Sequence, residues 1–199
     1  MSETAQEERI LYFGYGSNML TERLCKRCSS AEKIQPSMGS QHLLKGWKFT
    51  FSKLSTWNVD DEGNGKGNIE RTENSQDKVY GVIFSILKSE EKELDRMENF
   101  GKPGGYDKES FEIIDEKNSE ENLENVMVYY KRDHARNNPI PFDWYKEYIT
   151  KGAEQHKLPE SYIKKLENME SKIDGLLIKR DEADQEWAKK CFPHYRSEK

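Results

Sequence analysis

The spacing of apolar and polar positions along the chain predicts a series of short strands. Within residues 43–52, Trp47, Phe49 and Phe51 alternate with other residues, which places their rings on one face of a strand. The segment 77–87 is the most apolar stretch of the sequence and predicts a central strand. Further strands are predicted at residues 9–15, 110–115 and 125–131.

Other segments have the spacing of amphipathic helices. Leu20 and Leu24 are one helical turn apart. Ser89 is placed to cap a helix whose first turn contains Glu90 and Glu91. The predicted helices cover residues 20–28, 89–99, 140–156 and 158–170, and a glycine-rich turn is expected at 100–108. Strands and helices are mixed without strict alternation, which indicates an α+β fold.

The length of 199 residues predicts a single domain, which we place at residues 9–175. Residues 1–8 are expected to be a disordered polar arm, and residues 176–199 a short helix and a tail of no assigned role. Residues 53–68 predict a long, polar, glycine-rich loop, and loops of this length are often functional.

Composition and charge narrow the class of protein. The chain contains 8 Phe, 10 Tyr and 4 Trp with a net charge of only −5, which favours a compact domain with an aromatic core over disorder. The sequence has no basic stripe that would indicate nucleic-acid binding, and it has no apolar run near the roughly 20 residues that span a bilayer. The polar N-terminus is unlike a signal peptide, and three cysteines favour a reducing cytoplasm over a disulfide framework.

The segment LYFGYGSNML, residues 11–20, is the first candidate for a site. It predicts a strand, a glycine-rich turn and a helix start, an arrangement that exposes unpaired N–H groups to an anion. Gly14 and Gly16 would let the backbone approach a ligand, and Ser17 and Asn18 add polar side chains. A tight turn with a polar cap explains the same residues, and the spacing alone favours that simpler interpretation.

Glu98 is the second candidate. It follows the apolar Leu94 by four residues, so it shares the buried stripe of its helix with Leu94 and Met97. It also stands at the C-terminal end of that helix, where the dipole disfavours a carboxylate. Both conditions suit a general acid/base at neutral pH, although a side chain that turns outward at the helix end explains the position equally well.

The remaining reactive residues do not form a recognisable pattern. Cys25 and Cys28 make one CxxC inside a predicted helix without a second pair, so neither a zinc site nor a redox motif is supported. No GxSxG motif is present, and no metal or cofactor is expected. The histidines are scattered without ligand spacing: His42, His134, His156 and His194.

Five segments together resemble the γ-glutamylcyclotransferase family. YGSNMLTERL, VYGVIF, LDRMENFGKPGGYDK, VMVYY and KGAEQHKLPESYIKKLE occur in the order and spacing of that family, over about residues 9–170. The resemblance implies a small mixed-strand β-barrel surrounded by helices, and a homodimer. It also implies a reaction in which the α-amine of a γ-glutamyl-amino acid attacks its own γ-carbonyl, releasing 5-oxoproline and a free amino acid.

The resemblance also assigns roles to particular residues. Glu98 matches the catalytic glutamate of the family, and Tyr15, Gly16, Ser17 and Asn18 match its substrate loop. In this interpretation the turn at the start of the chain is a cradle. Two pocket tyrosines are implied as well: Tyr106, and either Tyr129 or its neighbour Tyr130, of which Tyr129 fits the motif better.

One segment departs from the family pattern. The family has a GGIA-like sequence where this chain has GKGNIERT, residues 65–72, and the loop before it is long and charged. We expect this loop to border the pocket, so the departure affects the choice of substrate more than the type of reaction.

The alternatives to a γ-glutamyl-amino acid cyclotransferase are cleavage of γ-glutamyl-amines or of glutathione, and a non-catalytic anion-binding module on the same fold. The YGSN form favours γ-glutamyl-amino acids over the YGSL that marks the glutathione-specific branch.

Overall fold

The computed structural model describes residues 7–55, 64–133, 135 and 139–173. The strands are β1 (Arg9–Gly14), β2 (Glu32–Lys33), β3 (His42–Lys45), β4 (Trp47–Leu54), β5 (Gly65–Arg71), β6 (Lys78–Leu87), β7 (Asp107–Asp115) and β8 (Leu123–Tyr130). The α-helices are α1 (Thr21–Cys25), α2 (Glu91–Met97), α3 (Asp143–Gln155) and α4 (Glu160–Glu167), with short 3-10 turns η1 (Ser17–Met19), η2 (Lys88–Glu90) and η3 (Ser119–Glu121).

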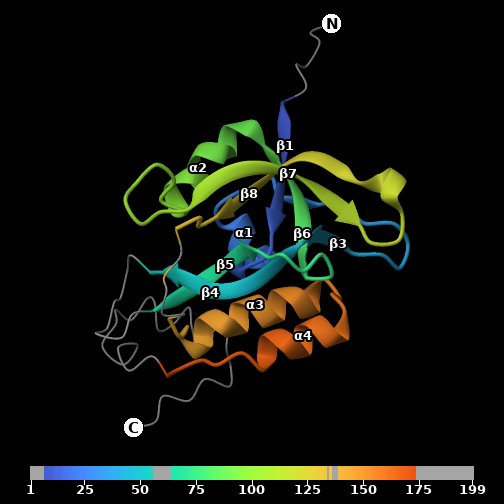
Figure 1. Ribbon diagram of the computed structural model, residues 1–199. Helices are drawn as coiled ribbons and strands as arrows, with labels where there is room; N and C mark the ends of the chain where they lie inside the picture. The colour runs from blue at the N-terminus through green and yellow to red at the C-terminus, as the bar shows by residue number, and fades with distance from the viewer. Residues whose placement is uncertain (1–6, 56–63, 134, 136–138, 174–199) are drawn as a thin grey trace, which may run out of the picture.

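A closed barrel of five strands forms the centre of the fold (Figure 1). The strands follow one another in the order β1, β8, β7, β3 and β6, and β6 pairs with β1 to close the ring. The β1–β8 pair is parallel and the other pairs are antiparallel. This confirms the α+β fold with a mixed-strand barrel and surrounding helices.

β6 is the central strand that the sequence predicts. It pairs with β1, β2 and β3, and all of its residues from Gly81 to Ile86 are buried. A strand that is covered on both faces reads as a continuous apolar run rather than as an alternation, because neither face needs polar residues. The apolar segment 77–87 is therefore explained by its place in the barrel.

The predicted strand at 43–52 is in fact two strands. Gly46 has a φ of +77°, which few residues other than glycine adopt, and this residue separates β3 from β4. β3 belongs to the barrel, whereas β4 pairs with β5 in a separate hairpin. The alternation itself is confirmed, since Trp47, Phe49 and Phe51 are all buried.

The predicted loop at 53–68 is also corrected by this hairpin. β4 continues to Leu54 and β5 already begins at Gly65, so both ends of the expected loop are strand. Residues 56–63 lie outside the described residues. The sequence did not indicate a strand at 65–68 because glycine and lysine have low strand propensity. Pairing with β4 stabilises the strand here in spite of that propensity.

The helix before Glu98 begins later than predicted. Ser89 lies within η2 and does not cap α2, whose first residue is Glu91. The Glu90 carboxylate instead accepts hydrogen bonds from the backbone N–H and the hydroxyl of Ser30 and from the hydroxyl of Ser29. The turn that follows α2 is confirmed, with positive φ at Asn99, Gly101 and Gly104.

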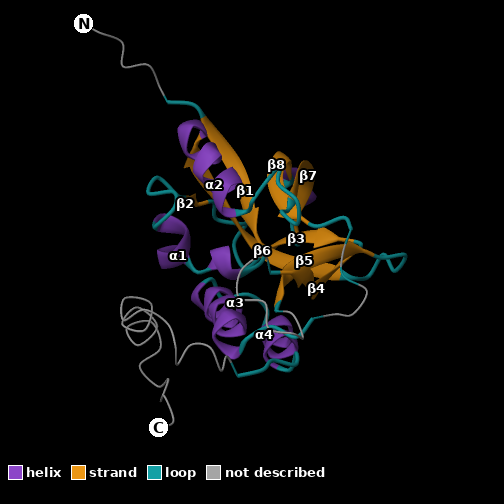
Figure 2. Cartoon of the chain, turned by 90° about the vertical axis from the view of Figure 1, so that its left-hand side faces the viewer, coloured by secondary structure: helices purple, strands orange, loops and turns teal. Residues whose placement is uncertain are grey.

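The two C-terminal helices are confirmed, with α3 preceded by Phe142 and α4 by Pro159. They pack on each other next to the β4–β5 hairpin (Figures 1 and 2). The predicted tail at 176–199 lies outside the described residues. Within the described part of the chain, no helix has both the length and the apolar composition needed to cross a membrane.

Helix α3 fixes the position of the loop that follows β1. α3 packs directly against η1, and the contact is made at Gly152, on the side of the helix that faces Met19 and Leu20. A Cβ atom at Gly152 would lie 2.6 Å from the Leu20 nitrogen and 2.7 Å from Cβ of Met19. The loop therefore lies against bare helix backbone, and any side chain at residue 152 would displace it.

We predict that Gly152→Ala lowers the free energy of unfolding by about 1–3 kcal/mol, because overpacking outweighs the better helix propensity of alanine. Urea unfolding measures this change. The control is Glu154→Ala on the exposed side of the same helix, which should change stability by less than about 0.5 kcal/mol. A Gly152→Ala protein more stable than the wild type would contradict the packing argument.

Candidate active site

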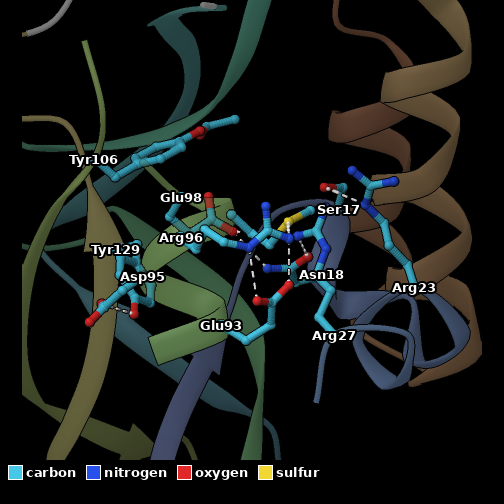
Figure 3. Close-up of polar contacts among 12 residues, drawn as sticks. Ser17, Asn18, Arg23, Arg27, Glu93, Asp95, Arg96, Glu98, Tyr106 and Tyr129 are labelled. Atoms are coloured by element: carbon cyan, nitrogen blue, oxygen red, sulfur yellow. Dashed lines mark hydrogen bonds and ion pairs between the residues drawn. The ribbon is translucent and has the colours of Figure 1, made fainter. Parts of the chain in front are cut away.

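A small hollow between the loop after β1, strands β5 and β8, helix α3 and the turn after α2 brings the predicted site residues together. Its lining contains all seven of them: Tyr15, Gly16, Ser17, Asn18, Glu98, Tyr106 and Tyr129. The other lining residues are Tyr12, Gly67 and Tyr145, which sequence reasoning missed. Figure 3 shows Asn18 and Glu98, which come from separate elements, turned toward each other.

The loop after β1 has the strand–turn–helix form that the sequence predicts. β1 ends at Gly14, and the 3-10 turn η1 holds Ser17 and Asn18, both of which are buried. The turn is closed by a hydrogen bond from the Met19 N–H to the Gly16 carbonyl, at 3.0 Å. Gly16 has a φ of −110°, and a Cβ atom there would meet nothing within 4 Å. The glycine therefore leaves open space at the hollow instead of relieving backbone strain.

The Glu98 side chain points into the protein, as its position in the stripe predicts. The residue caps the C-terminal end of α2, and its side chain is only 15% exposed. Its Oε1 atom accepts a hydrogen bond from Nδ2 of Asn18 at 3.0 Å and lies 3.6 Å from a guanidinium nitrogen of Arg27 (Figure 3). The alternative, a side chain turned toward solvent at the helix end, is wrong.

Asn18 uses both sides of its amide in this arrangement. Nδ2 donates to the Tyr12 hydroxyl at 2.9 Å as well as to Glu98, and Oδ1 accepts from Arg27 at 2.7 Å. The amide orientation is therefore set by its neighbours, with the oxygen toward the cation and the nitrogen toward the acceptors. Burial raises the pKa of Tyr12, and the charge of Glu98 raises it further, so this hydroxyl stays protonated.

Two tyrosines hold the backbone of β5 at the hollow. The Tyr106 hydroxyl donates to the Gly67 carbonyl at 2.6 Å, and the Gly67 N–H donates to the Tyr145 hydroxyl at 3.0 Å. Burial is the main cause that raises the pKa of both tyrosines. Both hydroxyls are therefore neutral at physiological pH, and their rings form part of an uncharged wall.

Tyr129, not Tyr130, faces the hollow. Tyr129 donates its hydroxyl to Oδ1 of Asp95 at 2.6 Å. Tyr130 points to the opposite side of β8, where its hydroxyl donates to Glu109 at 2.6 Å. There it lines a larger hollow of about 510 Å³ that contains none of the predicted site residues. The strand places successive side chains on opposite faces, so only one of the two can line the same hollow.

The other reactive residues lie elsewhere. Cys28 is buried, and burial raises the pKa of its thiol to about 12, so it is a poor nucleophile. No cluster of three or more potential metal ligands exists among the residues that the structure describes. His42 and His156 are buried outside the hollow, and His134 and His194 lie outside the described residues.

Arg27 is the charged neighbour that sequence reasoning missed. It lies beyond the end of α1, in a polar segment that looks like a solvated surface, and its partner Glu98 is 71 residues away in sequence. Tyr12 and Tyr145 were missed for a similar reason, since each looks like an ordinary core aromatic. Gly67 could have been suggested by its segment, residues 65–72, because this segment departs from the family pattern.

Comparisons with known proteins identify the family of the chain. The chain matches the AIG2-like family over residues 78–166. It is 30% identical over 172 residues to the γ-glutamylcyclotransferase of Bos taurus, and 30% over 173 residues to that of Homo sapiens, covering 82% of this chain and 80% of the relative in each case. The chain belongs to the γ-glutamylcyclotransferase family.

A solved structure of a γ-glutamyl cyclotransferase has the same fold. It superimposes with a TM-score of 0.74 and 27% identity, over 92% of this chain and 99% of the other. The resemblance found in the sequence is thus confirmed, and the protein is an enzyme of the cyclotransferase kind. The match to the AIG2-like family over 78–166 includes Glu98, Tyr106 and Tyr129.

We predict that Gly16→Val lowers kcat/KM at least tenfold while the free energy of unfolding changes by less than about 1 kcal/mol, because the new side chain enters open space at the hollow. The control is Gly46→Val. That side chain also enters open space, but the φ of +77° should reduce stability by roughly 1–2 kcal/mol without an effect on kcat/KM. Normal catalysis by Gly16→Val would mean that Gly16 serves only the turn.

Proposed function

We propose that this protein converts γ-glutamyl-amino acids into 5-oxoproline and a free amino acid, with Glu98 as the general acid/base. The names of its relatives support γ-glutamyl chemistry. The observation that favours this assignment most is the Glu98 carboxylate, held by Asn18 at the hollow and set among neutral lining residues. A binding module for anions would gain nothing from a carboxylate in this position.

The proposed reaction takes its nucleophile from the substrate. The substrate ammonium gives a proton to the Glu98 carboxylate, and the free amine attacks the γ-carbonyl carbon. A new C–N bond closes the five-membered lactam, the γ-amide C–N bond breaks, and Glu98 returns the proton to the leaving amine. The attacking nitrogen then loses its second proton to the Glu98 carboxylate, which passes it to the released amine, so that the products are the lactam and the ammonium form of the amino acid. General acid–base catalysis of this kind contributes about 10²–10⁴-fold, and a folded-back substrate adds a large proximity effect.

The neighbours of Glu98 suit a carboxylate that cycles between two protonation states. Asn18 donates to Oε1 at 3.0 Å and keeps the group in place. Arg27 lies 3.6 Å from the same oxygen, so the ionised carboxylate never stands as an isolated buried charge. Proton transfer to Glu98 therefore changes the existing Glu98–Arg27 ion pair. This needs less rearrangement of the surrounding side chains than the creation of a new ion pair.

The rest of the hollow is suited to hold the γ-glutamyl group. We assign the backbone of Tyr15, Gly16, Ser17 and Asn18 to the substrate cradle, because Gly16 leaves space there for a ligand to approach the chain. Tyr106 and Tyr129 form neutral walls whose hydroxyls are already engaged, with Gly67 and with Asp95. Rigid walls favour the folded-back substrate over its extended form.

Incubation with γ-glutamyl-alanine, glutathione and γ-glutamyl-ε-lysine, followed by measurement of 5-oxoproline, tests this proposal. We expect the highest kcat/KM with γ-glutamyl-alanine. Preferred turnover of glutathione or of γ-glutamyl-ε-lysine would move the enzyme to one of the two sister activities. Absence of 5-oxoproline with all three compounds would contradict the proposal.

Glu98→Gln should reduce turnover at least about 10²-fold, since glutamine keeps the size of the side chain but cannot accept and return a proton. Steady-state kinetics measures the loss, and circular dichroism checks that the fold is intact. The matched control is Glu93→Gln on the same helix, whose carboxylate is bound to Arg96 at the surface. Near-normal turnover of the Glu98 variant would exclude Glu98 as the acid/base.

A substrate acetylated on its α-amine should not react, because its nucleophile has been removed. The measurement is release of alanine from N-acetyl-γ-glutamyl-alanine, compared with the unblocked dipeptide under the same conditions. Release of alanine from the blocked compound would show that water attacks the γ-carbonyl. The enzyme would then be a hydrolase, and the intramolecular mechanism would be wrong.

A further inference from the structure

Lys53 is a buried lysine close to the proposed active site. Lys53 is only 5% exposed, although it is the second-last residue of β4. Lys53 has the same parity as the buried Trp47, Phe49 and Phe51, so the inward face of β4 continues at this lysine. A β-bulge at this point, where Ser52 and Lys53 both pair with Lys66 of β5, leaves Ser52 buried as well.

The Lys53 ammonium lies against the wall of the hollow. Nζ is 5.0 Å from the centre of the Tyr106 ring, and Tyr106 lines the hollow. Within the described residues, Nζ has neither a hydrogen bond nor an ion pair. Burial lowers the pKa of Lys53, whereas the negative charge of Glu98 raises it, which places the two groups within electrostatic reach of each other.

Other cations near the hollow are already partnered. Arg27 pairs with Glu98, Lys108 with Asp95, and Lys131 with Asp107. Arg23 has no carboxylate partner among the described residues, but its Nε donates to the Ser17 hydroxyl at 3.2 Å and its guanidinium lies over the Tyr148 ring.

Lys53 differs from all of these cations, because its described contacts offer no acceptor. A buried ammonium without an acceptor is unfavourable unless a ligand supplies one. The absence of an acceptor among the described residues therefore points to an anionic group that arrives with a ligand.

The position of Lys53 indicates which anionic group that is. If the proposed function is correct, the loop at Gly16 and Ser17 holds the glutamyl end, and Glu98 faces the reacting amine. The Lys53 ammonium lies over the ring of Tyr106, which comes from the turn after α2 and not from that loop. The part of the substrate that extends beyond the γ-carbonyl is the leaving amino acid, and its carboxylate is the remaining anionic group.

On the basis of the proposed function, we propose that Lys53 binds the carboxylate of the leaving amino acid. Lys53 is then a specificity-determining residue, because an amine leaving group without this carboxylate gains nothing from the ammonium. An ammonium–carboxylate hydrogen bond in a partly dry site discriminates by roughly tenfold to a hundredfold. The inference also gives a role to the atypical hairpin β4–β5, which contains both Lys53 and Gly67.

The test compares γ-glutamyl-alanine with γ-glutamyl-alaninamide, whose leaving group has a neutral amide in place of the carboxylate. For the wild type, kcat/KM should be at least tenfold higher with γ-glutamyl-alanine. Lys53→Met should remove most of this preference by lowering kcat/KM for γ-glutamyl-alanine, mainly through KM, with less than a threefold change for the amide. Lys53→Arg should keep the preference. The matched control is Lys48→Met, on the same strand, whose side chain is 49% exposed and pairs with Glu70 at 3.2 Å.

The outcomes separate this inference from the proposed function. Formation of 5-oxoproline from both compounds at equal efficiency by the wild type would overturn the role of Lys53 and leave the proposed function intact. An equal loss with both compounds in Lys53→Met would also overturn it. No 5-oxoproline from either compound would overturn the proposed function itself. The wild-type comparison needs no variant, so the inference remains testable even if Lys53→Met does not fold.

Discussion

The site depends on one side-chain amide, that of Asn18. Its nitrogen donates to Tyr12 on β1 and to Glu98 after α2, while its oxygen accepts from Arg27 after α1. The N-terminal segment around Asn18 is thereby joined to Glu98, which is 80 residues away in sequence. Each partner would be costly to bury alone, and the amide satisfies a hydroxyl, a carboxylate and a guanidinium together. Loss of this amide would leave all three without a shared partner.

The barrel provides the rigid frame that Asn18 needs. Tyr12 lies opposite Met127 in the parallel β1–β8 pair, which brings the end of β1 next to Tyr129. α3 then presses on the loop at Gly152, where the helix has no side chain to keep it away. β1 fixes where the loop begins, and the contact with α3 fixes how closely the loop packs against the rest of the protein. The position of Ser17 and Asn18 therefore follows from packing that lies outside the site.

Local patterns predicted most elements but not their long-range partners. The alternation of Trp47, Phe49 and Phe51 and the apolar run at 77–87 identified their strands, because burial imposes these patterns directly. The break at Gly46 depends on a backbone angle, and the sequence does not distinguish it from a glycine within a strand. Ser89 has the chemistry of a helix cap, but the chain there first forms a 3-10 turn.

The site shows the same limit. The motifs identified seven residues that do line one hollow, whereas the position of Arg27 depends on a contact across 71 residues. The amide of Asn18 was expected to serve the ligand, and its contacts with Tyr12 and Glu98 could not be read from the loop. Pairings between distant polar residues have no periodic signature. They are determined only when the fold brings the partners together.

Glu98 is the only charged residue among those that line the hollow in the described part of the chain. Five of the remaining nine are tyrosines, and burial raises the pKa of each one, so the wall is neutral. This arrangement suits a reaction whose nucleophile belongs to the substrate: the protein has to fold a flexible chain back on itself and move one proton. Additional charges in the wall would stabilise extended substrates as well as folded ones. The nearby cations are not among the lining residues: Arg27 pairs with Glu98, and the Lys53 ammonium lies against the ring of Tyr106.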